Sequence, residues 1–319
     1  MAFTAFRGMK PFSQLLFSAF VIIVCFLAFL VLSLIIAIPL FGLDSMMSIP
    51  TLNDLGNPQN ISLLKYFQVV QSIGLFVVPP FILGLLFLGN GITYLYLNKT
   101  VAFSSFLLVI LLVLSASPFI NFLGELNSQM HFPDWLSGVE NWMKVSEEKA
   151  DLLTEAFLNV NTIGGLLFNL FMIAFLPAIG EELLFRGVIQ RIFTNMTKSH
   201  HWGIWISAIL FSSLHMQFFG FIPRMLLGVL FGYLLVWSGT MWLPITAHFV
   251  NNGAAVIAWY MVNKNLISHK VETIGTTSDS YIWVVISFIL VFVLLWLFKH
   301  ENRENHLIIS DNYTDKKAV

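Results

Sequence analysis

The sequence predicts an all-α membrane protein, a polytopic bundle of about eight transmembrane helices. The 319 residues are 57% hydrophobic and only 10% charged, and long charge-free stretches recur along the chain. Soluble domains carry about 25% charged residues, so these charges are too few to cover a water-soluble globule of this size. The formal net charge of −1 offers no basic field for phosphates, which argues against nucleic acid as a partner. The single cysteine, Cys25, excludes a disulfide framework.

The charge-free stretches are assigned to spans by length, because a spanning helix needs about 20 apolar residues. The stretch 225–263 is long enough for two helices, and Gly239 with Pro244 supplies the break between them. Pro177 predicts a kink in the long fourth span. The predicted spans are residues 14–39, 66–88, 101–122, 161–193, 202–217, 222–238, 243–261 and 281–298.

The loop charges support an even number of spans with both termini in the cytoplasm. Cations precede the first span and follow the second, fourth and eighth, namely Arg7, Lys10, Lys99, Arg191, Lys198, Lys299, Arg303, Lys316 and Lys317. This arrangement places all of them on the cytoplasmic side, as the positive-inside rule requires. The opposite loops are mainly acidic, and the cations that remain there are Lys65, Lys144, Lys149, Lys264 and Lys270.

Three regions follow from this pattern. Residues 1–155 hold three transmembrane helices and an interfacial amphipathic segment, in which Trp135 and Trp142 are expected to anchor at the headgroups. The segment is expected to act as a structural lid, with gating of the substrate as the alternative. Residues 156–265 hold a core with polar clusters. Residues 266–319 hold the final transmembrane helix and a short polar cytoplasmic tail.

Polar side chains inside the predicted spans mark the candidate chemistry, because each costs several kcal/mol unless it is paired. They occur in the runs GEELLFRG, FSSLHMQ and TAHFVNNG, and at the start of the sixth span. At about 1.5 Å of rise per residue, a carboxylate, two histidines and an asparagine are expected in one layer of the membrane. These polar residues are Glu181, Glu182, Arg186, His215, Arg224, His248 and Asn252.

In the fourth span, the spacing of the charged residues predicts different roles for the neighbouring carboxylates of Glu181 and Glu182. Glu182 and Arg186 are four residues apart and are expected to form a charge pair on one helix face, with a helix-orienting role favoured over direct catalysis. Glu181 is turned about 100° away and has no local partner. An unpaired carboxylate is suited to act as a general base.

Together these groups predict a hydrolytic pocket. Glu181 with His215 is expected to activate water, while His248 and Asn252, which share one helix stripe, are expected to stabilise the oxyanion. The alternative is a single divalent metal ion such as zinc, held by the carboxylate and the two histidines. No HExxH sequence is present.

Structural interpretations stand beside these roles. By itself, His215 is more typical of a core histidine whose hydrogen bonds are made within the protein. Phe211, one turn before it, is typical of a residue that packs in the core. Asn252 and its neighbour Asn251 also suit helix packing in lipid. Arg224 near the outer end of the sixth span is expected to snorkel to the interface.

These residues resemble the motifs of the intramembrane CAAX-protease and bacteriocin-processing family, which includes the type II CAAX prenyl endopeptidases. The resemblance covers about residues 160–262. The motif EExxxR is matched by Glu181, Glu182 and Arg186, FxxxH by Phe211 and His215, and HxxxN by His248 and Asn252.

The resemblance implies an endopeptidase that works within the membrane on a membrane-associated protein or peptide, with residues 156–265 as its catalytic core. It assigns Glu181 and His215 to the attacking water, the other histidine and asparagine to the oxyanion hole, and Glu182, Arg186 and Phe211 to support. It leaves both a metallopeptidase and a metal-free glutamate mechanism open. It also implies a bacterial plasma-membrane protein, whose relatives act in peptide maturation or bacteriocin self-immunity.

Two other functions compete with this one. A non-catalytic membrane scaffold or bacteriocin-immunity protein on the same fold uses the motifs only for folding or partner binding. A proton-linked carrier ranks lower, because the spans show no inverted repeat of broken helices.

Overall fold

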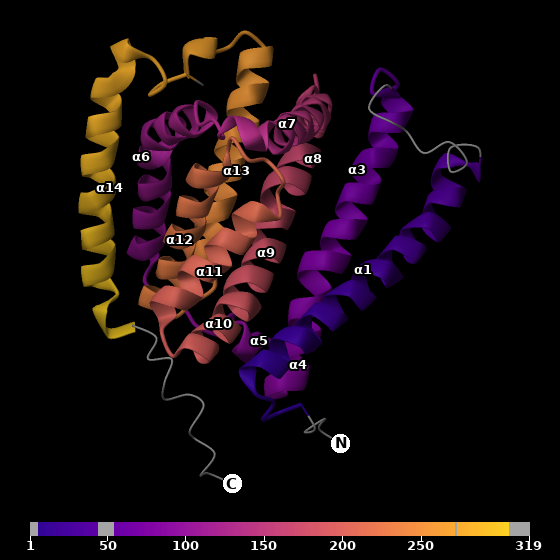
Figure 1. Ribbon diagram of the computed structural model, residues 1–319, viewed down its shortest axis with the longest axis vertical. Coiled ribbons are helices and arrows are strands. Elements are labelled where there is room, and N and C mark those ends of the chain that lie inside the picture. Colours follow the sequence, from indigo (N-terminus) through magenta and orange to yellow (C-terminus); the bar gives the residue numbers. More distant parts are fainter. Residues whose placement is uncertain (1–5, 44–53, 272, 306–319) are drawn as a thin grey trace.

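The computed structural model describes residues 6–43, 54–271 and 273–305, and it is all-helical over these residues (Figure 1). Short π-helical segments at Ile73–Val77, Leu170–Phe175 and Leu183–Ile189 join some of the helices end to end. The polar tail from residue 306 onward lies outside the described residues. The helices are α1 Pro11–Phe41, α3 Pro58–Ser72, α4 Val78–Leu88, α5 Gly91–Tyr94, α6 Phe103–Ser128, α7 Ser137–Leu158, α8 Ile163–Asn169, α9 Leu176–Glu182, α10 Gln190–Thr197, α11 His200–Ser213, α12 Phe221–Ser238, α13 Trp242–Asn263 and α14 Tyr281–Glu301.

The predicted fold class is confirmed, and the predicted count of eight spans is not. Among the described residues, six helices are long and apolar enough to cross a membrane: Pro11–Phe41, Pro58–Leu88, Phe103–Ser128, Ile163–Thr197, Phe221–Ser238 and Ser278–Glu301. The two other predicted spans form α11 and α13. At 14 residues, α11 extends about 21 Å, which is less than the roughly 30 Å hydrocarbon core. With 22 residues α13 is long enough, but its polar side chains lower its hydropathy.

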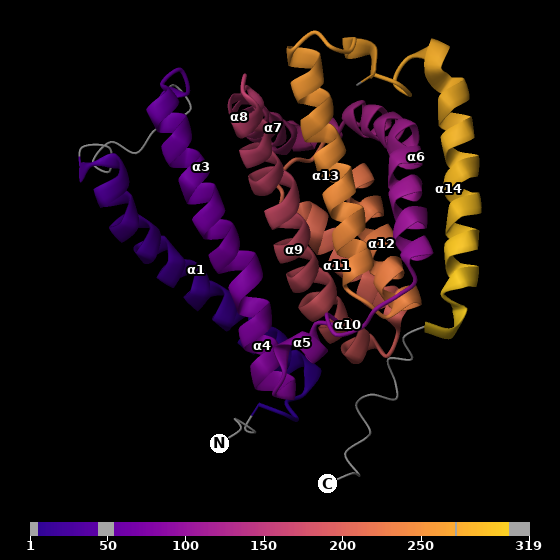
Figure 2. The same cartoon turned by 180° about the vertical axis from the view of Figure 1, so that it is seen from behind.

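The outer helices present apolar side chains to their surroundings. Figures 1 and 2 show α1 and α3 on one side of the bundle and α14 on the other, where α14 packs against α6. More than half of the surface of Phe20, Ile35, Phe292 and Trp296 is exposed. Such extended apolar surface is unfavourable in water and suits contact with lipid. The start of α1 and the end of α14 lie at the same end of the bundle, as an even number of crossings requires.

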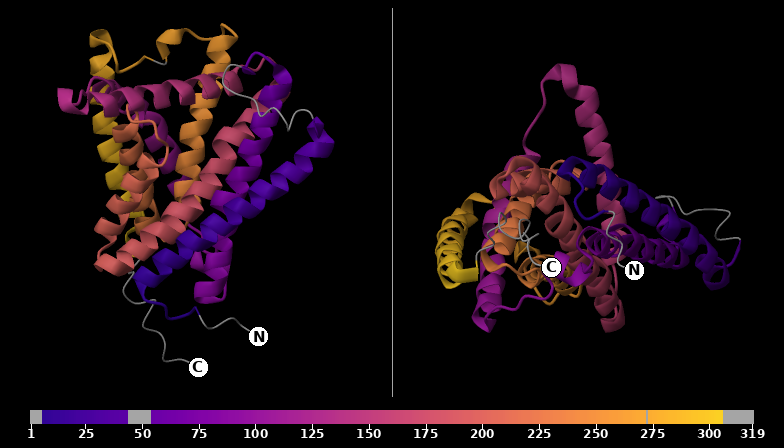
Figure 3. Two further views of the ribbon diagram at one scale, coloured as in Figure 1. Left: turned by 45° about the vertical axis from the view of Figure 1, so that its right-hand side comes forward. Right: turned by 90° about the horizontal axis from the view of Figure 1, so that it is seen from below.

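The predicted interfacial segment forms α7, which runs crosswise over one end of the bundle (Figure 3). Both predicted anchors, Trp135 and Trp142, are exposed. Lys144 pairs with Glu140 at 2.8 Å, and the carboxylate also accepts from His131 and from the main-chain N–H of Phe132. Hydrogen bonds from Lys144 and His131 lower the pKa of Glu140 to about 2. The ion pair gives a partner to Lys144, one of the cations that the predicted orientation places on the non-cytoplasmic side.

Close packing of α10 against α11 depends on Gly203. A Cβ placed there would meet the Thr194 side chain and would lie 2.8 Å from the main-chain oxygen of Gln190 and 2.9 Å from the Thr194 nitrogen. These backbone atoms cannot move without separating the helices. We therefore expect Gly203→Ala to lower the free energy of unfolding by about 1–3 kcal/mol, measured by denaturant titration in detergent. Gly124→Ala is the matched control, because its Cβ meets nothing within 4 Å and its expected effect is neutral or stabilising.

Candidate functional site

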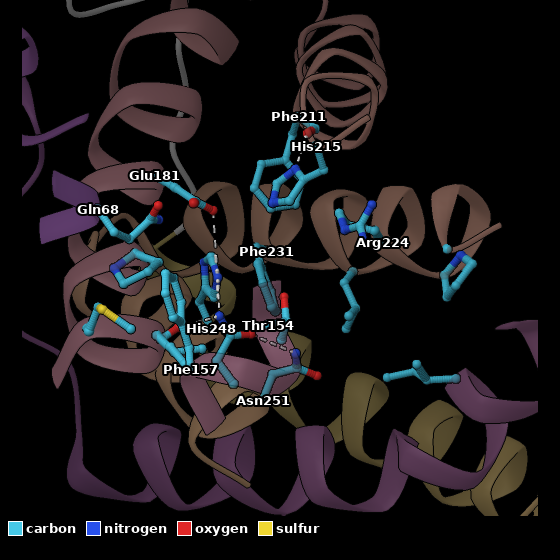
Figure 4. Close-up of a pocket in the computed structure, with 18 of the residues that line it drawn as sticks. Gln68, Thr154, Phe157, Glu181, Phe211, His215, Arg224, Phe231, His248 and Asn251 are labelled. Atoms are coloured by element: carbon cyan, nitrogen blue, oxygen red, sulfur yellow. Dashed lines mark hydrogen bonds and ion pairs between the residues drawn. The ribbon is translucent and has the colours of Figure 1, made fainter. Parts of the chain in front are cut away.

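A cavity of about 530 Å³ opens between the helices and is lined by residues from each of the three sequence motifs, namely Glu181, Phe211, His215, His248 and Asn252 (Figure 4). Residues from α3, α6, α7, α9, α11, α12 and α13 contribute to its wall, so segments far apart in sequence meet there. The polar residues that line it are Gln68, Thr154, Glu181, His215, Arg224, His248, Asn251 and Asn252.

The helix that carries the first motif changes its hydrogen-bonding pattern on both sides of the carboxylates. Pro177 stands at the start of α9, directly after the π-helical turns Leu170–Phe175, and a second π-helical segment begins at Leu183. Proline has no N–H to donate, so the regular ladder is interrupted where a kink is predicted. π-Bulges of this kind frequently occur at functional sites.

Glu182 and Arg186 form the predicted pair. The Arg186 Nη1 donates to Glu182 Oε1 at 2.8 Å, and the two side chains are 1% and 0% exposed. Arg186 Nη2 also donates to the main-chain oxygen of Gly228 at 3.2 Å, and the guanidinium lies over the rings of Phe211 and Phe231. The charge of Arg186 is therefore fully compensated within the protein.

Glu182 has a second partner that the sequence does not predict. Its Oε1 also accepts from Nδ1 of His248 at 2.8 Å. A carboxylate only accepts hydrogen bonds, so Nδ1 of His248 carries the proton and Nε2 faces Glu181 and the cavity. The Phe231 ring stacks on the imidazole at 5.5 Å between centroids. The histidine is thus fixed in tautomer and orientation.

Glu181 lies on the cavity wall with its side chain 13% exposed. Its Oε2 is 3.8 Å from Nε2 of His248, which is an ion-pair distance and too long for a hydrogen bond. As predicted, it does not share the Arg186 pair. The sequence prediction couples Glu181 to His215, and the structure brings both to the same cavity, with His248 as the closer charge partner of Glu181.

His215 is held by the residue one turn before it. Its Nδ1 lies 2.8 Å from the main-chain oxygen of Phe211, and the Phe211 ring meets the imidazole edge-on at 4.9 Å. A carbonyl oxygen only accepts, so Nδ1 donates and the neutral ring has an unprotonated Nε2. That nitrogen can accept a proton. Phe211 therefore does more than fill the core, since it orients His215 and covers Arg186.

Asn252 completes the third motif on α13. Its Nδ2 lies 3.2 Å from Nε2 of His248 and donates to the main-chain oxygen of Ile173 at 3.1 Å. Its Oδ1 accepts from Asn251 at 3.1 Å, and both asparagines line the cavity. The amide is held next to the histidine, as its position four residues later predicts.

Arg224 and Gln68 belong to the cavity wall and were not assigned to the site from the sequence. Arg224 was expected to snorkel to the interface, but it lines the cavity and donates to the main-chain oxygen and the Oε1 of Gln217. Its charge within a predicted span was the available signal. Gln68 comes from α3, in the part of the chain where no motif occurs, and only packing places it here.

Lys65 is another of the cations that the predicted orientation places on the non-cytoplasmic side, and its side chain is buried in the protein. Lys65 Nζ donates to the main-chain oxygen of Phe157 at 2.8 Å and to Oδ1 of Asn169 at 2.9 Å. Asn169 donates to the same Phe157 oxygen at 2.8 Å. Since the side chain of Phe157 lines the cavity, this cluster fixes the end of α7 beside the site.

The residues considered as metal ligands are not gathered at ligand distances from one another. Among the described residues, no three His, Cys, Asp or Glu side chains gather closely enough to hold one. The three candidates, Glu181, His215 and His248, all line the cavity, and His248 directs its Nδ1 to Glu182.

Comparisons with known proteins agree with the motifs. Residues 163–254 match the family model described as type II CAAX prenyl endopeptidase Rce1-like, which confirms the resemblance over this segment. The chain is also 31% identical over 86 residues to YpbD of Bacillus subtilis (strain 168), which is described as uncharacterized. This match covers 26% of the present chain and 41% of YpbD, so the chain spans about two fifths of that relative. No solved structure matches the chain.

Proposed function

We propose that the chain, whose residues 163–254 match the Rce1-like type II CAAX prenyl endopeptidases, is an intramembrane endopeptidase that hydrolyses a peptide bond of a membrane-associated protein or peptide. The observation that carries the proposal is the gathering of Glu181, His215, His248 and Asn252 around one cavity. Their residue types supply a general base, a second proton acceptor and two groups suited to an oxyanion hole.

In the proposed reaction, a water molecule binds between the Glu181 carboxylate and Nε2 of His215. Glu181 takes a proton from the water as the oxygen attacks the carbonyl carbon of the substrate. The same proton then passes to the nitrogen of the leaving amine, and the C–N bond breaks. His215 accepts a hydrogen bond from the water through Nε2 and orients it for attack.

The oxyanion that forms is stabilised by His248 and Asn252. His248 donates through Nε2 in its doubly protonated form, and the hydrogen bond from Nδ1 to Glu182 Oε1 at 2.8 Å turns Nε2 toward the cavity. Asn252 donates through Nδ2, which lies beside that nitrogen. The Glu182–Arg186 pair supports this step by holding His248 in place.

We also propose that both termini face the cytoplasm of a bacterium. The cations that flank α1, α10 and α14 favour this orientation. The similarity to a Bacillus subtilis protein supports a bacterial plasma membrane.

The test is cleavage of a membrane-tethered peptide library by the purified protein and its His215→Gln variant, with products identified by mass spectrometry. We expect the variant to lose at least about 100-fold in rate, because glutamine lacks the ring nitrogen that the Nδ1 contact to Phe211 holds in place to accept a hydrogen bond from the water and orient it. His300→Gln is the matched control, since His300 is an exposed residue at the end of α14. Activity that survives both His215→Gln and Glu181→Gln would favour a non-catalytic scaffold or immunity protein, with cleavage due to a contaminant.

A further inference from the structure

The two arginines at the site differ in how their charge is compensated. Arg186 is buried in an ion pair with Glu182. Arg224 is half-buried on the cavity wall, and its hydrogen bonds go to two neutral acceptors of Gln217, the main-chain oxygen at 3.2 Å and Oε1 at 2.8 Å. Among the described residues no carboxylate forms an ion pair with Arg224.

The carboxylates nearest to Arg224 are engaged elsewhere. Glu147 and Asp151 on α7 and Glu181 in the cavity act on Arg224 at longer range. Glu147 Oε2 accepts from the main-chain N–H of Phe219 at 3.0 Å, and Asp151 Oδ1 accepts from the Gln217 amide at 3.4 Å. Both therefore fasten α7 to the loop after α11. Over the described residues, the guanidinium has N–H donors left for a ligand.

The place of Arg224 suits contact with a bound substrate. It lines the same cavity as Glu181 and His215, and in Figure 4 Arg224 and Glu181 lie on opposite sides of His215. A peptide held with its scissile bond at Glu181 and His215 would extend past the guanidinium. At about 530 Å³ the cavity holds only a few residues, so a group that meets Arg224 lies close to that bond.

We infer that Arg224 is a specificity-determining residue that binds a carboxylate of the substrate, and that the enzyme selects peptides with such a group within a few residues of the scissile bond. This inference rests on the proposed function. A planar guanidinium matches a carboxylate with two parallel hydrogen bonds. In a cavity enclosed by helices such a contact is stronger than in water. It also offsets the repulsion between the substrate carboxylate and Glu181.

The carboxylate has two possible sources, the C-terminus of the peptide and an Asp or Glu side chain. The probe is an apolar peptide library in matched pairs. One pair differs only in a free C-terminal carboxylate or a C-terminal amide, and the other, amidated, has Glu or Gln at an internal position. Binding and kcat/KM are measured for each pair with the wild type, Arg224→Gln, Arg224→Lys and Arg303→Gln.

We expect the wild type to prefer the carboxylate form of one pair by about 30-fold or more, since removing one partner of a buried charge pair is costly. Arg224→Gln should reduce this ratio to within about threefold of unity, and Arg224→Lys should give an intermediate ratio because it keeps the charge and loses the planar fork. Arg303 lies exposed after α14, so Arg303→Gln should keep the wild-type ratio. The pair that shows the preference identifies the source of the carboxylate.

The outcomes separate the inference from the proposed function. If the wild type binds both members of each pair equally well, the inference is overturned, whether or not the peptides are cleaved. A wild-type preference that persists in Arg224→Gln also overturns it and leaves Arg224 as a residue that only positions the α11–α12 loop. Preferential binding without cleavage supports the carboxylate site and contradicts the endopeptidase.

Discussion

Replacing Glu181 by Gln is expected to lower the rate of peptide cleavage by about 10³-fold, because the amide cannot take a proton from water. The variant keeps the size and shape of the side chain. The ion-pair contact to His248, at 3.8 Å, is the interaction it weakens. The fold should therefore persist. The rate is measured under single-turnover conditions in detergent, and the unfolding transition is recorded on the same preparation.

Glu148→Gln provides the matched control. This glutamate lies exposed on α7, outside the cavity wall, and the same change of charge is expected to leave the rate at the wild-type value. A Glu181→Gln variant that is folded and within tenfold of the wild type would exclude this carboxylate as the base. His215 would then be the candidate for the group that takes the proton from water.

The largest expected effect on stability is that of Arg186→Met. Arg186 and Glu182 are almost completely buried, and removing the arginine leaves a buried carboxylate with His248 as its remaining ionic partner. Breaking a buried ion pair in this way costs about 3–5 kcal/mol. The change in the free energy of unfolding is measured by denaturant titration in detergent. A loss below about 1 kcal/mol would contradict a pair that stabilises the core.

Two further variants test the cause of the loss. Adding Glu182→Gln to Arg186→Met removes the uncompensated charge, so the double variant is expected to be more stable than Arg186→Met alone. Lys144→Met removes the cation of the partly exposed pair with Glu140 on α7 and should change stability little. A double variant no more stable than the single one would assign the loss to packing of the Arg186 stem rather than to charge.

Much of the fold and part of the site follow from the sequence because they depend on short separations along a helix. The scarcity of charge predicts the membrane bundle, and the six apolar helices agree with it. The spacing of four residues predicts the contact of Glu182 with Arg186 and of His248 with Asn252, and both are present. An α-helix brings residues four apart together whatever else the chain does.

The number of spans was not predictable in the same way. An apolar stretch does not determine the length of the helix that it forms, as α11 illustrates: a span is predicted over residues 202–217, and the helix ends at Ser213 after 14 residues. The polar side chains of α13 are tolerated because they face a cavity built by other helices. Hydropathy depends only on residue composition, whereas the exposure of a helix to lipid depends on how the other helices pack around it.

Contacts between distant segments were decided by the tertiary structure alone. The hydrogen bond between Glu182 and His248 joins residues 66 apart, and the one between Lys65 and Phe157 joins residues 92 apart. Arg224 lines the cavity because α12, which carries it, packs against α11 and α13. Local spacing along the chain therefore accounts for the side chains that share a helix face. Helix packing decided which faces meet, because it depends on the shape of every side chain between the helices.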